Sequence, residues 1–195
     1  MMMTPHAPLV KMALTLAALT ILSACGGETQ RYSVPAAPVT EKKIAIAYRS
    51  VELLAVSLPA YAASEQIHVR GEGGALLASS ELLWSDDPSR AVTLELGRYL
   101  SQMTGARVAP EPWPFADRAS VRVDVRVEEM LADGDTLFLM SGQYFVAPDA
   151  GGRDRSGLFS ISAPIATGGG AAAIAAARGE VVRDLARKIA RDGLR

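Results

Sequence analysis

The chain has 195 residues, of which 49% are hydrophobic, so it can form a globular domain with a substantial core. Its 20 basic and 21 acidic residues give a formal net charge of −1. This balance excludes the strong positive charge of a nucleic-acid-binding protein and that of a basic helix on a membrane surface.

The first 24 residues have the pattern of a secretory signal peptide. Lys11 precedes an apolar run from Met12 to Leu22, and small residues follow that run. The run has about 11 residues, whereas a helix that spans a bilayer needs about 20. We therefore predict that residues 1–24 export the chain and are then removed.

The predicted cut site resembles the lipobox of bacterial lipoproteins, since it reads Leu22-Ser23-Ala24-Cys25. In that group the cysteine thiol is lipidated, the chain is cleaved before it, and the new N-terminus is acylated, for example with palmitate. The alternative is an ordinary signal peptide that ends near the only cysteine of the chain, but an exported protein with one unpaired thiol is unusual. The resemblance therefore implies lipidation of Cys25.

Gly26 follows the cysteine, where an aspartate would resemble a signal for retention in the inner membrane. The glycine favours the periplasmic face of the outer membrane. Because the chain has no basic surface helix, the lipid must supply the membrane affinity, and two or more acyl chains are needed for a stable anchor.

The mature chain is expected to consist of a short tether, residues 25–31, and a single domain, residues 32–195. The six residues that follow the cysteine in the tether reach ~20 Å at most, so the domain is held near the membrane.

The first part of the domain has the composition of short strands and loops. Residues 32–34 are a strand candidate, and residues 43–49 alternate in the manner of a strand. Residues 66–70 are a further strand, and a glycine-rich turn separates them from a hairpin partner at 75–78.

A helix is predicted for residues 88–104. Asp87 suits the N-cap and Pro88 the first helical position, and Gly105 is placed to end the helix in a left-handed conformation. The apolar positions form a single stripe, which consists of Val92, Leu96, Tyr99, Leu100 and Met103.

A short strand at 107–109 leads into a segment with prolines at 110, 112 and 114. Trp113 and Phe115 are interleaved with these prolines. We expect both rings to pack on the sheet, because packed aromatic side chains are commoner than exposed ones.

The second half predicts a three-stranded antiparallel meander over 120–128, 136–146 and 158–165, with a hairpin at Asp133-Gly134. In the first strand, the valines at 121, 123, 125 and 127 point to the core. Arg122, Asp124, Arg126 and Glu128 then point to solvent or to a partner.

The chain is expected to end in a helix from Ala171 onward, with Arg178 on or near its polar face. The order of elements predicts an α+β fold, in which two helices pack on one face of a mostly antiparallel or mixed sheet.

The sequence offers no catalytic or metal-binding set. His68, the only histidine outside the signal peptide, lies in a predicted strand, and a Gly-x-Ser-x-Gly motif and a Cys/His cluster are both missing. We therefore expect a protein that is not an enzyme and that has no cofactor or metal ion.

Several short motifs, taken in their order, resemble the ABC-type transport auxiliary lipoprotein family, the PqiC-like proteins. They are Tyr32-Ser33-Val34, Leu58-Pro59-Ala60-Tyr61, Ile67-His68-Val69-Arg70, Leu83-Trp84-Ser85, the strand Val121–Val127 and an alanine-rich final helix. The chain departs from the family after Tyr61, where Ala62-Ala63-Ser64-Glu65 replaces the usual Leu-Asp-Arg.

The resemblance implies an outer-membrane lipoprotein that works with an MCE-type system for lipid transport. Its partners would be an inner-membrane MCE-domain protein, which forms a tunnel across the periplasm, and the associated ABC transporter. The lipoprotein would dock the far end of that tunnel, and a homo-oligomeric ring would suit this role.

Two other functions stay open. An outer-membrane assembly lipoprotein, such as an LptE-like plug or a secretin pilot, would bind a β-barrel or a secretin. A lipid carrier would need an apolar cavity of its own. Tyr61, Trp84 and Trp113 are candidates for structural or partner contacts, and Arg122, Asp124 and Arg126 are candidates for a partner interface. Cys25 is the candidate lipidation site.

Overall fold

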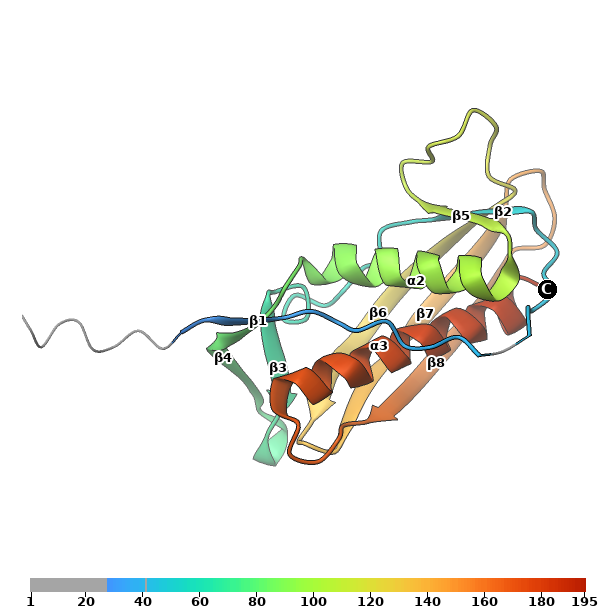
Figure 1. The fold of residues 1–195 in the computed structure, drawn as a ribbon. Helices are drawn as coiled ribbons and strands as arrows, with labels where there is room; N and C mark the ends of the chain where they lie inside the picture. Colours follow the sequence, from blue (N-terminus) through green and yellow to red (C-terminus); the bar gives the residue numbers. More distant parts are fainter. Residues whose placement is uncertain (1–27, 41) are drawn as a thin grey trace, which may run out of the picture.

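The computed structural model of the chain describes residues 28–40 and 42–195, and it confirms the predicted α+β class (Figure 1). A mixed sheet of eight strands carries two long helices, α2 (Pro88–Thr104) and α3 (Gly170–Lys188). The predicted signal peptide and Cys25 lie outside the described residues.

The long strand β6 (Val121–Asp133) is the centre of the sheet. It pairs in antiparallel register with β7 (Leu137–Pro148), which pairs in turn with β8 (Arg155–Pro164), so the predicted meander is confirmed. On its other side, β6 pairs in parallel with β2 (Ser50–Leu53) near its start and with β3 (Gln66–Arg70) near its end.

Three further strands extend the sheet beyond β2 and β3. The strand β5 (Arg107–Pro110) lies beside β2, β4 (Leu76–Trp84) beside β3, and β1 (Gln30–Tyr32) beside β4. Only the β3–β4 pair among them is antiparallel. The first half of the domain is therefore assembled on the meander.

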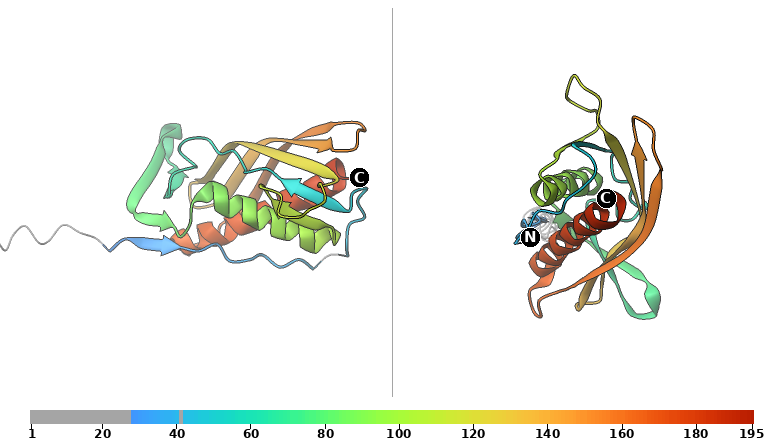
Figure 2. Two further views of the ribbon diagram at one scale, coloured as in Figure 1. Left: turned by 90° about the horizontal axis from the view of Figure 1, so that it is seen from above. Right: turned by 90° about the vertical axis from the view of Figure 1, so that its right-hand side faces the viewer.

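Both helices cover the same face of the sheet (Figure 2). The carboxylate of Asp87 accepts a hydrogen bond of 2.7 Å from the Arg90 backbone N–H, as expected for an N-cap. Gly105 ends α2 with a φ of 71°. The helix α3 continues into a π-helical turn, η3 (Ile189–Gly193), at the C-terminus.

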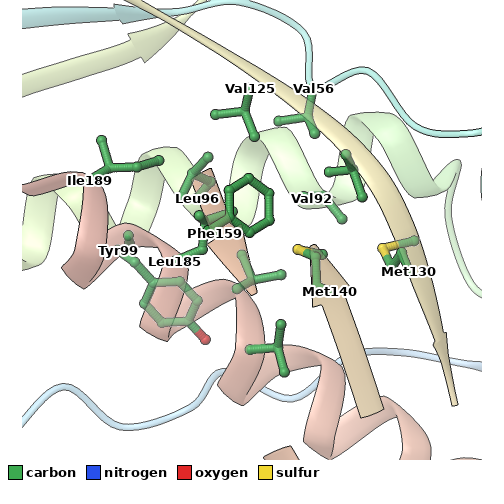
Figure 3. Packing of buried hydrophobic residues seen from close by; sticks show 14 of the residues in the cluster. Val56, Val92, Leu96, Tyr99, Val125, Met130, Met140, Phe159, Leu185 and Ile189 are labelled. Carbon is green, nitrogen blue, oxygen red and sulfur yellow. The ribbon is translucent and has the colours of Figure 1, made fainter. Parts of the chain in front are cut away.

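The core lies between the sheet and the helices. The four valines at 121, 123, 125 and 127 are buried, as the alternation predicts. Figure 3 shows Leu96 of α2 and Leu185 of α3 beside Phe159 of β8 and Met140 of β7.

The strand predicted for residues 43–49 is wrong. The Ile44 N–H donates to the carbonyl of Met103, and the Ala47 N–H to the carbonyl of Leu194, both at 2.8 Å. Carbonyls near the C-terminal ends of α2 and η3 thus satisfy this backbone, so it needs no neighbouring strand.

The start of the fold also differs from the prediction, since β1 begins at Gln30 and not at Tyr32. Two residues assigned to the tether, Gln30 and Arg31, are therefore paired with β4. The strand predicted for 75–78 runs on to Trp84, where β1 joins it.

Residues 33–40 form an extended strap across the outer side of both helices (Figures 1 and 2). The Ala37 N–H donates to the hydroxyl of Tyr99 on α2 at 2.7 Å. On α3, a Cβ at Gly179 would lie 2.7 Å from the carbonyl oxygen of Pro35, so only glycine admits the strap this closely. The strap thus forms a third layer over the helices.

A substitution at Gly142 tests how closely β6 and β7 pack. Its φ is +157°, and a Cβ there would lie 2.2 Å from the carbonyl oxygen of Arg126. We expect Gly142→Ala to lower the free energy of unfolding by about 3 kcal/mol or more, because backbone strain and overpacking each cost about 1–3 kcal/mol. Urea denaturation measures this change.

The matched control is Gly134→Ala in the β6–β7 turn. Gly134 has a φ of +59° and no atom within 4 Å of an added Cβ, so only the left-handed backbone penalty of about 1–2 kcal/mol applies. Equal losses in the two variants would contradict this account of Gly142.

Candidate functional site

Tyr61 is a structural residue in this fold. Its hydroxyl accepts a hydrogen bond of 3.1 Å from the Met130 N–H, and its ring makes an edge contact with His68 at 5.5 Å. Burial raises the pKa of the Tyr61 phenol, which stays protonated at neutral pH. The hydroxyl therefore fixes the turn after Pro59 to β6, while the side chain stays partly exposed.

Trp84 is also internal, since it is buried where β4 meets the helices. The guanidinium of Arg178 lies 4.7 Å from the centre of its ring, a cation–π arrangement. The backbone carbonyl of Trp84 accepts a hydrogen bond from Arg31 of β1. Trp84 thus joins β1, β4 and α3, which excludes it as an exposed contact.

Arg178 of α3 is a buried charged residue, and its position differs from the one that the sequence pattern predicted. It is 1% exposed and forms an ion pair of 3.1 Å with Glu95 of α2, so its predicted position near the polar face is wrong. Burial raises the pKa of the Glu95 carboxyl, and Arg178 opposes that shift. The spacing of the residues could have predicted this burial, because position 178 falls between Ile174 and Val181 of the apolar stripe.

Three other candidates, Arg122, Asp124 and Arg126, lie on the face of the sheet opposite the helices, called here the open face. Arg126 pairs with Asp124 at 2.8 Å and lies 5.0 Å from the ring centre of Phe145. Arg122 pairs with Glu52 of β2 at 3.2 Å. The predicted orientation of these β6 side chains is confirmed, and their charges are matched by neighbours.

A cleft of about 490 Å³ lies at one end of the open face, beside the loop between β5 and β6. We call it the distal cleft. It brings together Trp113 and Arg122, two of the six predicted contact residues, and leaves the other four outside. Its lining consists of Glu52, Trp113, Arg118, Ala119, Val121, Arg122, Ala147, Pro148 and Asp149.

The loop that carries Trp113 is held by its own contacts. The indole N–H of Trp113 donates to the carbonyl of Asp117, and the ring meets Phe115 edge-on at 4.9 Å. Arg107 stacks 4.7 Å from the Phe115 ring centre and pairs with Asp117 at 2.8 Å.

The burial expected for the two aromatic rings is wrong for Phe115, which is 40% exposed, and Trp113 is only half-buried. The reason is that the loop projects beyond the sheet (Figure 1). The segment therefore presents a preformed aromatic surface next to the distal cleft.

Sequence reasoning missed three charged residues of the distal cleft, Glu52, Arg118 and Asp149. Arg118 and Asp149 approach to 3.8 Å across its mouth. They come from a short strand and two loops, where no periodic pattern singles out a side chain. The cleft offers an aromatic ring and paired charges, which suit recognition of a protein surface.

Within residues 28–40 and 42–195, no group of histidine, cysteine or acidic side chains is arranged to hold a metal ion. The helices of this same part of the chain are too short or too polar to span a bilayer.

Comparison with known families identifies the family of the chain. A family model described as the ABC-type transport auxiliary lipoprotein component matches residues 32–190. No curated protein matches the chain significantly.

Two of the solved structures that match the chain show that the fold is shared. One is an uncharacterized protein with a TM-score of 0.66 and 15% identity. The match covers 84% of this chain and 97% of that protein. The other is a Xanthomonas campestris protein assigned to the family DUF330, with a TM-score of 0.64 and 13% identity, over 82% of this chain and 92% of its own.

The Glu95–Arg178 pair can be tested by paired substitutions. We expect Glu95→Gln to lower the free energy of unfolding by about 3–5 kcal/mol, because it leaves the guanidinium charge buried without its carboxylate. The double variant Glu95→Leu/Arg178→Met removes both charges and should recover most of that loss. Urea denaturation compares the two, and a double variant as unstable as the single one would contradict the pairing.

Proposed function

Because the chain belongs to the ABC-type transport auxiliary lipoprotein family, we propose that it docks a periplasmic lipid-transport tunnel at the outer membrane. Members of this family are lipoproteins that accompany a transport system, and they are not known as enzymes. The proposal adds three points: Cys25 as the lipidated residue, the outer membrane as its location, and an MCE-domain protein with its ABC transporter as the partner.

The observation that carries the proposal is the separation of the two ends of the molecule. The described chain enters at β1, and Gln30 is five residues from Cys25, a distance of at most ~17 Å. The loop of Trp113 and the distal cleft lie at the opposite end of the sheet (Figure 1). With Cys25 in the outer membrane, the cleft faces the periplasm, from which an inner-membrane partner approaches.

The residues of the distal cleft support a protein partner in preference to a small molecule. Tryptophan and arginine are the residues most enriched where binding energy concentrates in interfaces. Trp113 is half-exposed on a loop that its own contacts hold in place, so little side-chain entropy is lost on binding. The ion pairs of Arg122 and Arg118 can exchange their acids for those of a partner.

Removal of the lipidation site gives the first test. We expect Cys25→Ser to abolish metabolic labelling of the protein with palmitate and to move it from the membrane to the soluble fraction, since the chain has no other thiol. A second variant, Cys25→Ser with Ser33→Cys, restores a thiol at the wrong place and should stay unlabelled. Persistent labelling of either variant would contradict lipidation at Cys25.

Capture of partners from the detergent-solubilised envelope gives the second test. We expect the wild-type chain to retain an MCE-domain protein and Trp113→Ala/Arg122→Glu to lose it, because truncation of a central tryptophan costs about 2 kcal/mol or more, roughly thirtyfold in Kd. Arg98→Glu is the matched control, since Arg98 is exposed on α2, on the opposite side of the sheet.

Mass spectrometry of the captured proteins separates the two functional classes. Recovery of an outer-membrane β-barrel or a secretin in place of an MCE-domain protein would overturn the docking proposal and favour an assembly lipoprotein. Unchanged capture by the double variant would exclude the distal cleft as the docking site.

A further inference from the structure

The β3–β4 hairpin exposes two neighbouring leucines at its tip. Leu76 is 42% exposed and Leu77 is 58% exposed. Successive residues of a strand point to opposite faces, so both faces of this tip are apolar. The turn that joins the strands, residues 71–75, carries a single charge, that of Glu72. Adjacent exposed leucines on a projecting hairpin mark an interaction surface.

The hairpin extends from the end at which the chain enters the fold (Figure 1). Gln30 pairs with Leu82 of β4. Cys25 precedes Gln30 by five residues, and Leu77 precedes Leu82 by five residues. Each of these segments spans at most ~17 Å, so the lipidated residue and the two leucines reach out from the same point of the sheet.

We propose that the β3–β4 hairpin inserts Leu76 and Leu77 into the bilayer surface that holds Cys25. The hairpin is then a second, non-covalent contact of the domain with the membrane. This inference rests on the lipidation of Cys25 in the proposed function, and it is independent of the docking partner.

A lipid surface fits the hairpin better than a protein does, because the two leucines lie on opposite faces. A protein partner that packs against one face leaves the other leucine in water, whereas an inserted tip is surrounded by lipid. More apolar surface lies at the same end: Leu137, after the β6–β7 turn, is 37% exposed. A cleft of about 420 Å³ beside that turn is lined in part by Val69, Ile165 and Ile174.

The charges at this end set the depth and the lipid preference. Arg70 is paired with Glu129 and Asp133, while Glu72 and Asp135 are exposed acids. Insertion therefore relies on apolar contact and does not require anionic lipid. Glu72 lies in the turn beyond both leucines. Its carboxylate stays at the level of the headgroups, so the insertion is shallow.

The consequence is a defined orientation. A tether of a few residues by itself leaves the domain free to rotate about Cys25. A second contact at the hairpin fixes the axis of β6 relative to the membrane. The distal cleft, at the other end of the sheet, is then held away from the bilayer.

A fluorophore that senses polarity tests the insertion. Lipidated Cys25 has no free thiol, so Leu77→Cys in the otherwise native chain can be labelled selectively with the nitrobenzoxadiazole dye. In vesicles of phosphatidylcholine and phosphatidylethanolamine, we expect its emission to shift to the blue and doxyl-labelled lipids to quench it. Leu76→Cys should behave likewise, which provides a second site if one variant is destabilised.

Leu158→Cys is the matched control, because Leu158 is 71% exposed but lies in the half of β8 near the distal end. Its probe should stay in water and escape quenching. Probes at 76 and 77 that behave like the probe at 158 in acylated protein would overturn the insertion alone. The intact mass of the protein reports acylation separately, and a chain without acyl mass would overturn the anchor in the proposed function.

The same probe identifies a competing occupant. The double variant Cys25→Ser/Leu77→Cys is labelled with the same dye, and the dye emission is measured in buffer without vesicles. A blue shift that grows with protein concentration there would identify a second copy of the chain as the occupant and would overturn insertion into lipid. An emission that stays that of an aqueous probe supports the membrane contact.

Discussion

The pairing of β6 with its neighbours is the constraint on which the rest of the structure depends. Two parallel strands dock on one side of β6 and the meander on the other, so most of the sheet is built around it. Because side chains alternate along a strand, its register sends the valines at 121–127 to the helices and Arg122, Asp124 and Arg126 to the open face. A shift of one residue would exchange the core for the charged face.

The helical side of the molecule is already occupied. The strap of residues 33–40 lies over α2 and α3, and the Glu95–Arg178 pair is buried between those helices, beneath Trp84. Separating the two charges of this buried pair is costly, so the pair holds α2 and α3 together. The proposed contacts use the open face and the two ends of the sheet.

These two ends differ in chemistry as the proposed function requires. The end at β1 and the β3–β4 hairpin presents leucines beside the predicted lipid anchor. The other end presents Trp113 with the paired charges of Arg118 and Arg122. Apolar side chains suit a lipid surface, whereas an aromatic ring among exchangeable ion pairs suits a protein surface. One sheet separates the two proposed contacts.

Local sequence patterns determined much of this protein. The alternation over 121–127, the capped apolar stripe of α2 and the hairpin at Asp133-Gly134 predicted elements that the structure contains. Each depends on residues a few positions apart, which act through strand or helix periodicity. The lipobox resemblance at Cys25 is likewise local, and the family resemblance rested on the order of such short motifs.

Only the tertiary structure decided which distant residues meet. Arg122 pairs with Glu52 across 70 positions of sequence, and Arg178 with Glu95 across 83. Tertiary packing likewise decided the parallel pairing of β2 and β3 with β6, the irregular path of residues 43–49 and the exposure of Phe115. No local period encodes such contacts, because they depend on how whole elements pack and on which backbone groups that packing satisfies.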